Sequence, residues 1–407
     1  MRVYLSPCGM GVGHVSRCKA IVDALVERGW PVLVSTYSSG LEYASRLGYT
    51  TAETVPLWMK MDNEGRIDFK RTAATSPGFF RGLWSLVRQV VAEIKNIQHF
   101  KPSLVISDTR ISSLIAARFL GVPSLAILNQ FKVRIARRPG KGGLRPLDRV
   151  FFFIANLVWW FVSVVIGWVW SFAEKILIPD LPPPHTVSSN NLSIPRRYAR
   201  KVEFVGPLLG ASFCNSPKRV AQGRSGRATG MPLILVPLSV SPEEGYVFTR
   251  RIEKILEELS GRYRIVMSRG RASGSTEAER KGNLTIYDWI VGLDEYLEAC
   301  DLVVSRAGQV TVLNSLAYGK PLLIIPIPDH PEQLGNARRA SELGVATVLA
   351  AEELTAPLLD STIDRMLNSP EYAKRAAEIR DLTCRMNGLE RVIAAVAQLS
   401  QEGGRPC

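Results

Sequence analysis

The chain is poor in the side chains that build metal sites and disulfide frameworks. Its 407 residues include six cysteines and four histidines. The cysteines stand at positions 8, 18, 214, 300, 384 and 407, and no two of them have CxxC spacing. A structural zinc site is therefore not expected, and reduced thiols in a cytoplasmic protein are the simplest interpretation. The sequence D-x-D is also absent, so a metal-bridged pyrophosphate is not indicated.

Acidic residues are fewer than basic residues, 37 against 51, which gives a net charge of +14. This balance favours anionic partners, such as a membrane surface, nucleic acid or phosphorylated substrates. The N-terminus also lacks a signal-peptide pattern, because Met1-Arg2 runs directly into the strand-like Val3-Tyr4-Leu5. A hydrophobic content of 46% is a globular value, and the length suits two domains.

The first strand, at residues 2–7, leads into a glycine-rich turn that contains Gly11, Gly13 and His14. A dinucleotide fingerprint would need glycine in place of His14 and an acid after the next strand, at residues 31–36. Both are missing, so nicotinamide or flavin binding is not expected. The pattern instead places His14 at a helix N-terminus, where the dipole favours a neutral, base-competent imidazole. A capping histidine is the alternative.

Asp108 ends another buried strand, at residues 104–107. Open α/β sheets bind ligands at the carboxyl ends of their strands. Asp108 is therefore placed to orient His14 and stabilise its charge, as a carboxylate does for a catalytic imidazole. Capping of the following helix is the alternative.

The second half contains a comparable unit at residues 301–337. A strand at 302–304, the turn Arg306-Ala307-Gly308, a helix from Gln309 and a strand at 322–327 follow one another. The helix N-terminus attracts a phosphate or pyrophosphate. An ordinary βαβ unit without a ligand fits the same pattern.

Residues 132–173 interrupt the alternation of strands and helices. Seven basic residues and one acid lie between Lys132 and Arg149, and residues 150–173 carry no charge. At 1.5 Å per residue these 24 residues reach roughly 36 Å, but a single membrane crossing would separate two strands of one sheet. We therefore expect a shallow hairpin or interfacial helix on a membrane surface; a buried helix pair or an oligomer interface is the alternative. The long uncharged run argues against nucleic acid.

The stretch 287–337 resembles the donor domain of GT-B glycosyltransferases, which have two Rossmann-like domains. The nearest resemblance is to family 1 and to the lipid-linked peptidoglycan GlcNAc transferase of family 28. Arg306-Ala307-Gly308 with Thr311 is similar to the R/H-x-G-x-x-T/S phosphate turn of that family. Glu332-Gln333 with Asn336-Ala337 matches its D/Q-Q-x-x-N-A motif except at the first position.

The resemblance implies a role for each matching residue. His14 would be the catalytic base, supported by Asp108. In place of the glutamate that binds the ribose, this chain has Asn314, whose amide lacks the two charge-assisted acceptors of a carboxylate. The remaining residues expected at the site are the glycine-loop residues Gly11 and Gly13 and the donor-binding residues Ser239, Trp289, Ile290, Arg306, Ala307, Gly308, Gln309, Thr311, Asn314, Glu332 and Gln333.

The resemblance also implies an architecture. We expect an α/β chain of two Rossmann-like domains with parallel sheets. The predicted parts are an acceptor domain at 1–207 with the hydrophobic, membrane-associating insertion 132–173, a linker at 208–231, a donor domain at 232–390 and a helix end and tail at 391–407.

The predicted activity is that of an inverting, metal-independent glycosyltransferase without a cofactor. It would move a sugar from a nucleotide-sugar to a lipid-linked or membrane acceptor at the cytoplasmic face of the cell membrane. We expect the donor to be a UDP-sugar. Two alternatives are a non-catalytic, membrane-bound nucleotide-sugar-binding subunit and a nucleotide-sugar 2-epimerase.

Overall fold

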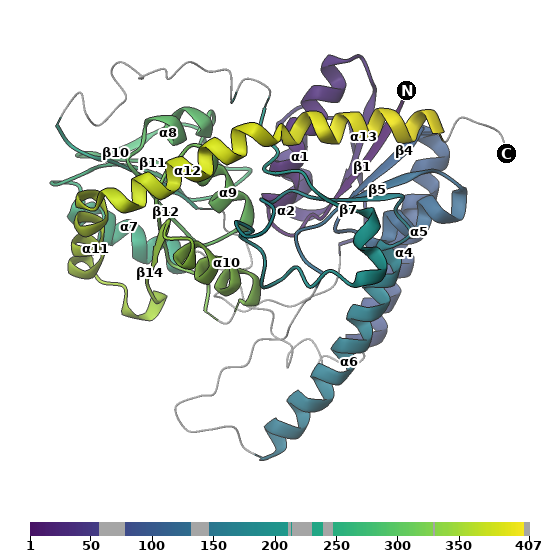
Figure 1. The fold of residues 1–407 in the computed structure, drawn as a ribbon, viewed down its shortest axis with the longest axis horizontal. Coiled ribbons are helices and arrows are strands. Elements are labelled where there is room, and N and C mark those ends of the chain that lie inside the picture. The colour runs from purple at the N-terminus through teal and green to yellow at the C-terminus, as the bar shows by residue number, and fades with distance from the viewer. Residues whose placement is uncertain are drawn as a thin grey trace.

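The chain forms two α/β domains, shown at the right and the left of Figure 1. The computed structural model describes residues 1–56, 78–131, 146–210, 213, 230–238, 247–328 and 330–402. Three predictions therefore fall wholly or mostly outside the described residues: Ser239, the basic segment 132–145 and the linker 208–231.

The first domain is built on a parallel sheet with the order β3-β2-β1-β4-β5-β6-β7. Its strands are short apolar runs that are buried on both faces, as parallel strands require. In β1, Val3 and Leu5 face one hydrophobic cluster and Tyr4 faces another. The strands are β1 (Val3–Pro7), β2 (Val32–Thr36), β3 (Thr51–Glu53), β4 (Leu104–Asp108), β5 (Ser124–Ile127), β6 (Lys175–Ile178) and β7 (Val202–Phe204).

Helices cover both faces of this sheet. Helix α5 ends where Gly121 adopts the left-handed conformation, with φ of 67°, which costs glycine little. The helices are α1 (Gly13–Glu27), α2 (Ser38–Arg46), α4 (Gly78–Phe100), α5 (Ile111–Leu120) and α6 (Pro146–Trp170), and a 3₁₀ helix, η1 (Arg196–Lys201), precedes β7.

The second domain repeats the plan, with the strand order β10-β11-β9-β8-β12-β13-β14. All neighbours are parallel except β10 and β11. The strands are β8 (Leu233–Pro237), β9 (Arg264–Ser268), β10 (Glu279–Lys281), β11 (Leu284–Tyr287), β12 (Leu302–Ser305), β13 (Leu322–Ile324) and β14 (Ala346–Val348). The helices are α7 (Val247–Leu259), α8 (Leu293–Ala299), α9 (Gln309–Ala317), α10 (Pro331–Glu342), α11 (Ala356–Asn368) and α12 (Pro370–Met386), with a short 3₁₀ helix, η4 (Ala351–Glu353). The two-domain α/β fold with parallel sheets is confirmed.

The last helix, α13 (Gly388–Glu402), returns to the first domain (Figure 1). Its Val392 and Val396 are fully buried in the hydrophobic cluster that also contains β1 and α1. A Cβ atom at Gly388 would lie 2.8 Å from the carbonyl oxygen of Val205 and 2.7 Å from that of Pro207, so a side chain does not fit there. The boundary predicted at residue 390 lies inside this helix.

Helix α6 contains the described part of the predicted insertion, as one continuous helix. Its last turn is buried in the first domain, where the ring of Trp170 meets that of Phe131 edge-on, 5.9 Å between centroids. Further back along the helix, Trp160 and Phe161 are each 63% exposed. Within the described part of the chain, no helix is long and apolar enough to cross a membrane.

Candidate functional site

The site is centred on a histidine–aspartate pair at the carboxyl edge of the first sheet. β1 and β4 pair in parallel with Pro7 opposite Asp108, so the glycine-rich turn after β1 lies beside Asp108. His14 Nδ1 lies 2.8 Å from Asp108 Oδ1. The aspartate side chain is fully buried and the histidine side chain is 23% exposed. A buried carboxylate thus holds an imidazole whose other side is accessible.

The turn before His14 depends on glycine. A Cβ atom at Gly9 would lie 2.0 Å from the carbonyl oxygen of Tyr37, and Gly11 has a φ of 72°. Gly13 is the first residue of α1. Close approach of two backbone segments, together with a left-handed residue, brings His14 to the start of the helix.

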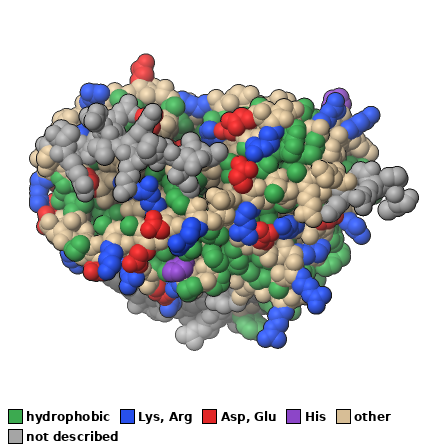
Figure 2. Space-filling model, turned by 45° about the horizontal axis from the view of Figure 1, so that its top comes forward, with side chains coloured by type: hydrophobic (Ala, Val, Ile, Leu, Met, Phe, Trp, Pro, Cys, Tyr) green, Lys and Arg blue, Asp and Glu red, His purple; other side chains and the backbone are tan. Residues whose placement is uncertain are grey.

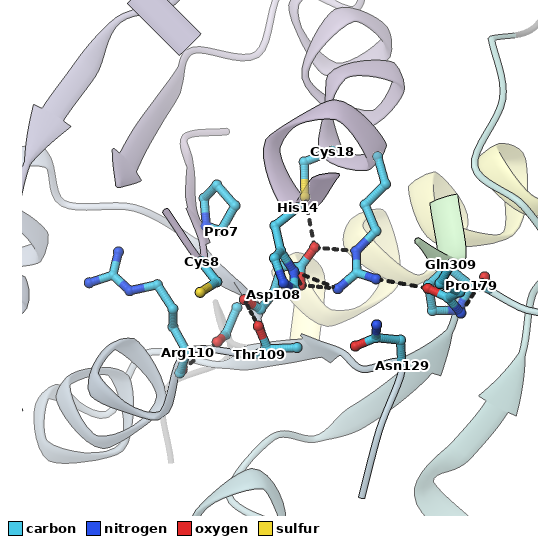
Figure 3. A network of polar contacts seen from close by, with 12 residues as sticks. Pro7, Cys8, His14, Cys18, Asp108, Thr109, Arg110, Asn129, Pro179 and Gln309 are labelled. Atoms are coloured by element: carbon cyan, nitrogen blue, oxygen red, sulfur yellow. Dashed lines mark hydrogen bonds and ion pairs between the residues drawn. The ribbon is translucent and has the colours of Figure 1, made fainter. Parts of the chain in front are cut away.

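Arg17 completes the pair and was not predicted. Its Nε donates to Asp108 Oδ2 at 2.5 Å, and its Nη2 contacts Asp108 Oδ1 and lies 2.9 Å from His14 Nδ1. Figure 3 shows His14 and Asp108 close together, with dashed contacts that lead from them to Gln309. Positions 14 and 17 are neighbours on one helix face, and this i, i+3 spacing is the signal in the sequence that could have identified Arg17.

The charges of this cluster offset one another. Burial by itself raises the pKa of Asp108, but the adjacent Arg17 and His14 outweigh it and hold that pKa well below its usual range. Burial raises the pKa of the neighbouring Cys18 thiol, and the Asp108 carboxylate raises it further. Asp108 therefore remains an anion, and Cys18 remains a neutral thiol.

The phosphate turn of the second domain lies at the N-terminus of α9. Gly308 is the N-cap residue and no side chain caps the helix, so the first amides of α9 have no intrahelical acceptor. The guanidinium of Arg306 lies 3.7 Å from the ring centroid of Phe248. Ala307 has a φ of 63°, and its carbonyl accepts a hydrogen bond from Asn336 Nδ2 at 3.1 Å. Free amides beside a fixed cation form a site suited to an anion.

The other predicted residues of α9 have different surroundings. Gln309 is buried and points into the first domain, whereas Thr311 and Asn314 are half-buried. Gln309 was predicted to bind the donor, but its side chain contacts Arg17.

Glu332 and Gln333 lie in the first turn of α10. Glu332 Oε1 accepts a hydrogen bond from Asn129 Nδ2 of the first domain at 3.2 Å. Gln333 Oε1 accepts from the backbone amide of Ile327 at 2.9 Å. The N-cap residue His330 accepts from the Gln333 amide through Nδ1, and burial lowers the pKa of His330. Glu332 therefore faces the first domain, while Gln333 braces the chain after β13.

Trp289 and Ile290, predicted to contact the base, lie after β11. The Trp289 ring packs on Tyr43 of the first domain, 4.9 Å between centroids, and Ile290 is buried. The backbone amide of Trp289 donates to Ser275 O at 3.1 Å, so that amide is already bonded. In the described parts of the chain, no cluster of three His, Cys, Asp or Glu side chains is placed to hold a metal ion.

Two family models match separate parts of the chain. Residues 1–142 match the model described as glycosyl transferase family 1. Residues 244–386 match the glycosyltransferase family 28 C-terminal domain. The first match contains His14 and Asp108, and the second contains the α9 turn and α10.

Relatives and solved structures agree with these matches. An uncharacterized glycosyltransferase of Methanosarcina acetivorans is 26% identical over 99% of this chain and 96% of its own length. The UDP-N-acetylglucosamine–N-acetylmuramyl-(pentapeptide) pyrophosphoryl-undecaprenol N-acetylglucosamine transferase of Desulforamulus reducens is 34% identical over 30% of this chain and 33% of its own. The crystal structure of glycosyltransferase VinC with dTDP superposes with a TM-score of 0.59 at 17% identity, covering 99% of this chain and 100% of that chain.

Proposed function

Since this chain is a glycosyltransferase of the GT-B fold, similar to families 1 and 28, and takes its sugar from a nucleotide-sugar donor, we propose that it inverts the anomeric carbon with His14 as the base. His14 Nε2 removes the proton of an acceptor hydroxyl, and the acceptor oxygen attacks the anomeric carbon. The bond from that carbon to the β-phosphate oxygen breaks, and its electron pair leaves with the nucleoside diphosphate. Asp108 stabilises the imidazolium that forms.

The observation that carries the proposal is the contact of 2.8 Å between His14 Nδ1 and Asp108 Oδ1. A proton on Nδ1 can be donated to the carboxylate, and this leaves the lone pair on Nε2. A neutral imidazole with this tautomer is a general base, and its exposed side allows an acceptor to approach.

The leaving group needs charge stabilisation, which the second domain offers without a metal ion. The uncapped amides of α9 and the guanidinium of Arg306 are the donors for the diphosphate. We further propose that Glu332 binds the sugar hydroxyls and that Trp289 contacts the base, as the family resemblance implies. Ser239 stays a prediction from the sequence.

A UDP-sugar is the proposed donor. The name of the Desulforamulus reducens relative gives a UDP-sugar, and the structure of VinC holds dTDP, so both nucleotides belong in a binding test. A bound nucleotide stabilises the fold by RT ln(1 + [L]/Kd), so a thermal-shift panel of UDP, dTDP, GDP and ADP reports the preference without an acceptor. We expect UDP to give the largest increase in Tm.

The acceptor is proposed to be lipid-linked and reached at the cytoplasmic face of the cell membrane. The support is a set of large apolar side chains that lie exposed on α4 and α6. These exposed residues are Leu83, Trp84, Val87 and Val91 of α4 and Phe153, Leu157, Trp160, Phe161, Val164, Val165 and Trp168 of α6. Large exposed apolar side chains on a helix that follows a basic segment in the sequence suit the interface of an anionic bilayer.

The direct test of this function uses radiolabelled UDP-sugars and membrane lipids. We expect label in the lipid phase, and proton NMR of the product should show the anomeric configuration opposite to that of the donor. Retained configuration would contradict the mechanism. Binding of UDP without transfer would favour the non-catalytic subunit, for which Asn314 is the supporting feature. A sugar changed at carbon 2 without an acceptor would favour the epimerase.

A further inference from the structure

Gln309 is the point at which the donor helix enters the acceptor domain. It is the first residue of α9 and is 3% exposed. Its Oε1 accepts a hydrogen bond from Arg17 NH1 at 3.1 Å. Its Nε2 lies 3.4 Å from both Asp180 Oδ2 and Pro179 O. Because arginine only donates, and carboxylate and carbonyl oxygens only accept, the surroundings define which end of the amide faces Arg17.

The groups that receive Gln309 are themselves fixed. Asp180 is fully buried, and its carboxylate accepts the backbone amides of Leu181, Val187 and Ser188 at 2.7, 3.0 and 2.8 Å. The amide of Gln309 is therefore held between a rigid anchor on one side and the guanidinium of Arg17 on the other.

The opposite side of Arg17 is fully engaged with the catalytic pair. Its guanidinium contacts both oxygens of Asp108, and Asp108 Oδ1 accepts from His14 Nδ1; the guanidinium also lies 2.9 Å from Nδ1, but two donors do not bond each other, so Asp108 is the link to the imidazole. A planar fork with five N–H donors can contact Asp108 and Gln309 together, whereas the compact ammonium of lysine cannot. The chain of contacts thus runs without a gap from the first residue of α9 to the imidazole.

We propose that Arg17 is a positioning residue that links the donor-binding helix to the base through Gln309. This inference rests on the proposed role of His14 as base. A diphosphate at the N-terminus of α9 would lie one residue from Gln309, so donor binding fixes the residue that orients Arg17. Arg17 in turn holds the Asp108 carboxylate toward His14 Nδ1. The base is then aligned when the donor is in place.

The positive charge of Arg17 also acts on the groups near His14. Arg17 and Asp108 contact the imidazole, Cys18 of α1 interacts with Asp108 and Arg17, and Glu332 of α10 interacts with Arg17 across the domain boundary. The guanidinium offsets the Asp108 anion beside His14.

The test uses the small number of histidines. With ¹⁵N-labelled histidine, the full chain gives ring signals from His14, His99, His185 and His330 alone, and a His14→Ala variant assigns the first. Long-range ¹H–¹⁵N spectra distinguish the two neutral tautomers and the imidazolium. They are recorded from pH 5 to 9 for the wild type, Arg17→Met, Arg17→Lys and Gln309→Met. Arg46→Gln is the matched control, because Arg46 NH1 also crosses the domain boundary, to Ala272 O and Gly274 O, without touching the pair.

We expect the wild type to carry the neutral proton on Nδ1. In Arg17→Met and in Arg17→Lys the His14 signals should change, because neither side chain holds both oxygens of Asp108 as the guanidinium fork does. Gln309→Met should alter the His14 signals and lower the rate of sugar transfer, by up to the roughly 10²–10⁴-fold that a positioned base contributes. The stabilisation by UDP should remain. Arg46→Gln should leave the His14 signals unchanged.

The proposal is overturned if His14 has wild-type signals in either Arg17→Lys or Gln309→Met. It is also overturned if Arg46→Gln changes those signals as much as Gln309→Met does. The two conservative variants keep the test informative should Arg17→Met fail to fold. Because the spectra need no donor, acceptor or turnover, they are read separately from the transfer assay. A failure of the proposed function would appear in that assay, as wild-type protein that transfers no sugar.

Discussion

At the scale of the residue, burial and neighbouring charges have opposite effects on the pKa of Asp108. Burial alone would raise the pKa of its carboxyl, but Arg17 and His14 outweigh burial and hold that pKa well below the usual range. An aspartate in the unfolded chain has a pKa of about 3.9. The ion pairs thus stabilise the folded state fully above that pH. Their contribution is lost as the pH falls through the lower folded-state pKa.

Asp108→Asn should therefore remove an acid-sensitive part of the stability. The amide leaves Arg17 buried without its partner, so we expect a loss of about 3–5 kcal/mol at pH 7. The loss should shrink as the pH falls below about 4, because the carboxyl of the unfolded wild-type chain then takes up a proton while the folded one is still ionised. Urea unfolding of the two proteins between pH 3 and 7 measures this. A loss that is the same at every pH would show that the charge of Asp108 is not the cause.

His330 gives the opposite kind of titration. Burial lowers its pKa in the folded state, whereas histidine in the unfolded chain has a pKa of about 6.5. Between these values the unfolded state binds the additional proton. The stability that neutral His330 contributes is thus present above about pH 6.5 and is lost as the pH falls.

His330→Asn should remove this pH dependence, because an asparagine oxygen also caps a helix and does not titrate. We expect the Tm of the wild type to fall more steeply than that of the variant as the pH drops below 6.5. Calorimetry across this range makes the comparison. Parallel Tm curves would mean that His330 takes up its proton equally in both states.

His14 and Asp108 could be predicted from the sequence because local patterns identify them: a glycine turn before a helix and an acid after a buried strand. Arg17 was missed although it lies three residues from His14. Its partner Gln309 is 292 residues away, and no local pattern reports such a contact. Asn129 was missed for the same reason, since its partner Glu332 lies in the other domain.

At the scale of the element, strands and most helices followed from periodicity. Buried parallel strands are continuous apolar runs, and α7 buries Ile252, Ile255, Leu256 and Leu259 at helical spacing. The return of α13 to the first domain was not predicted, because an amphipathic helix does not reveal which surface covers its apolar face. The sequence also left open whether residues 150–173 form a hairpin. The described part is the single helix α6.

The junction between α12 and α13 should tolerate only glycine at position 388. An added methyl group would lie within 2.8 Å of two carbonyl oxygens, so the backbone must shift. We expect Gly388→Ala to lower the stability by about 1–3 kcal/mol, as overpacking does. Gly261→Ala is the control, since a Cβ atom there meets no atom within 4 Å. Equal changes in the urea midpoint of the two variants would contradict the steric argument.

The exposed face of α6 should bind anionic membranes. Trp160→Ser with Phe161→Ser removes two aromatic side chains that are each 63% exposed, and should reduce sedimentation with phosphatidylglycerol vesicles at least about tenfold. Phe119→Ser is the control, because Phe119 of α5 is 74% exposed outside this helix. The double variant should keep the wild-type Tm. Unchanged sedimentation of the double variant, or an equal loss in Phe119→Ser, would exclude α6 as the membrane contact.

At the scale of the whole molecule, the two domains meet through polar and apolar contacts. Arg46 donates to the carbonyls of Ala272 and Gly274, and Leu181 and Val187 of the first domain join the hydrophobic cluster around α9. On the face shown in Figure 2, basic and acidic side chains lie intermingled. The net charge of +14 is thus not gathered into one basic region on that face.

The architecture of two parallel-sheet domains could be predicted because each half of the sequence contains repeated strand–helix patterns. The contacts between the domains could not, because they join residues that are remote in sequence. His14 and Arg17 share helix α1, whereas Asp108 and the donor helix α9 belong to other parts of the chain and meet them only in the folded molecule. We propose that these contacts make His14 a base.

The most direct measurement compares sugar transfer from a radiolabelled UDP-sugar to membrane lipids by the wild type, His14→Ala and Arg46→Gln. We expect His14→Ala to transfer sugar about 10²–10⁴-fold more slowly, the usual contribution of a general base, with unchanged stabilisation by UDP. Arg46→Gln should keep a rate close to that of the wild type. Equal transfer rates for His14→Ala and the wild type would contradict the account.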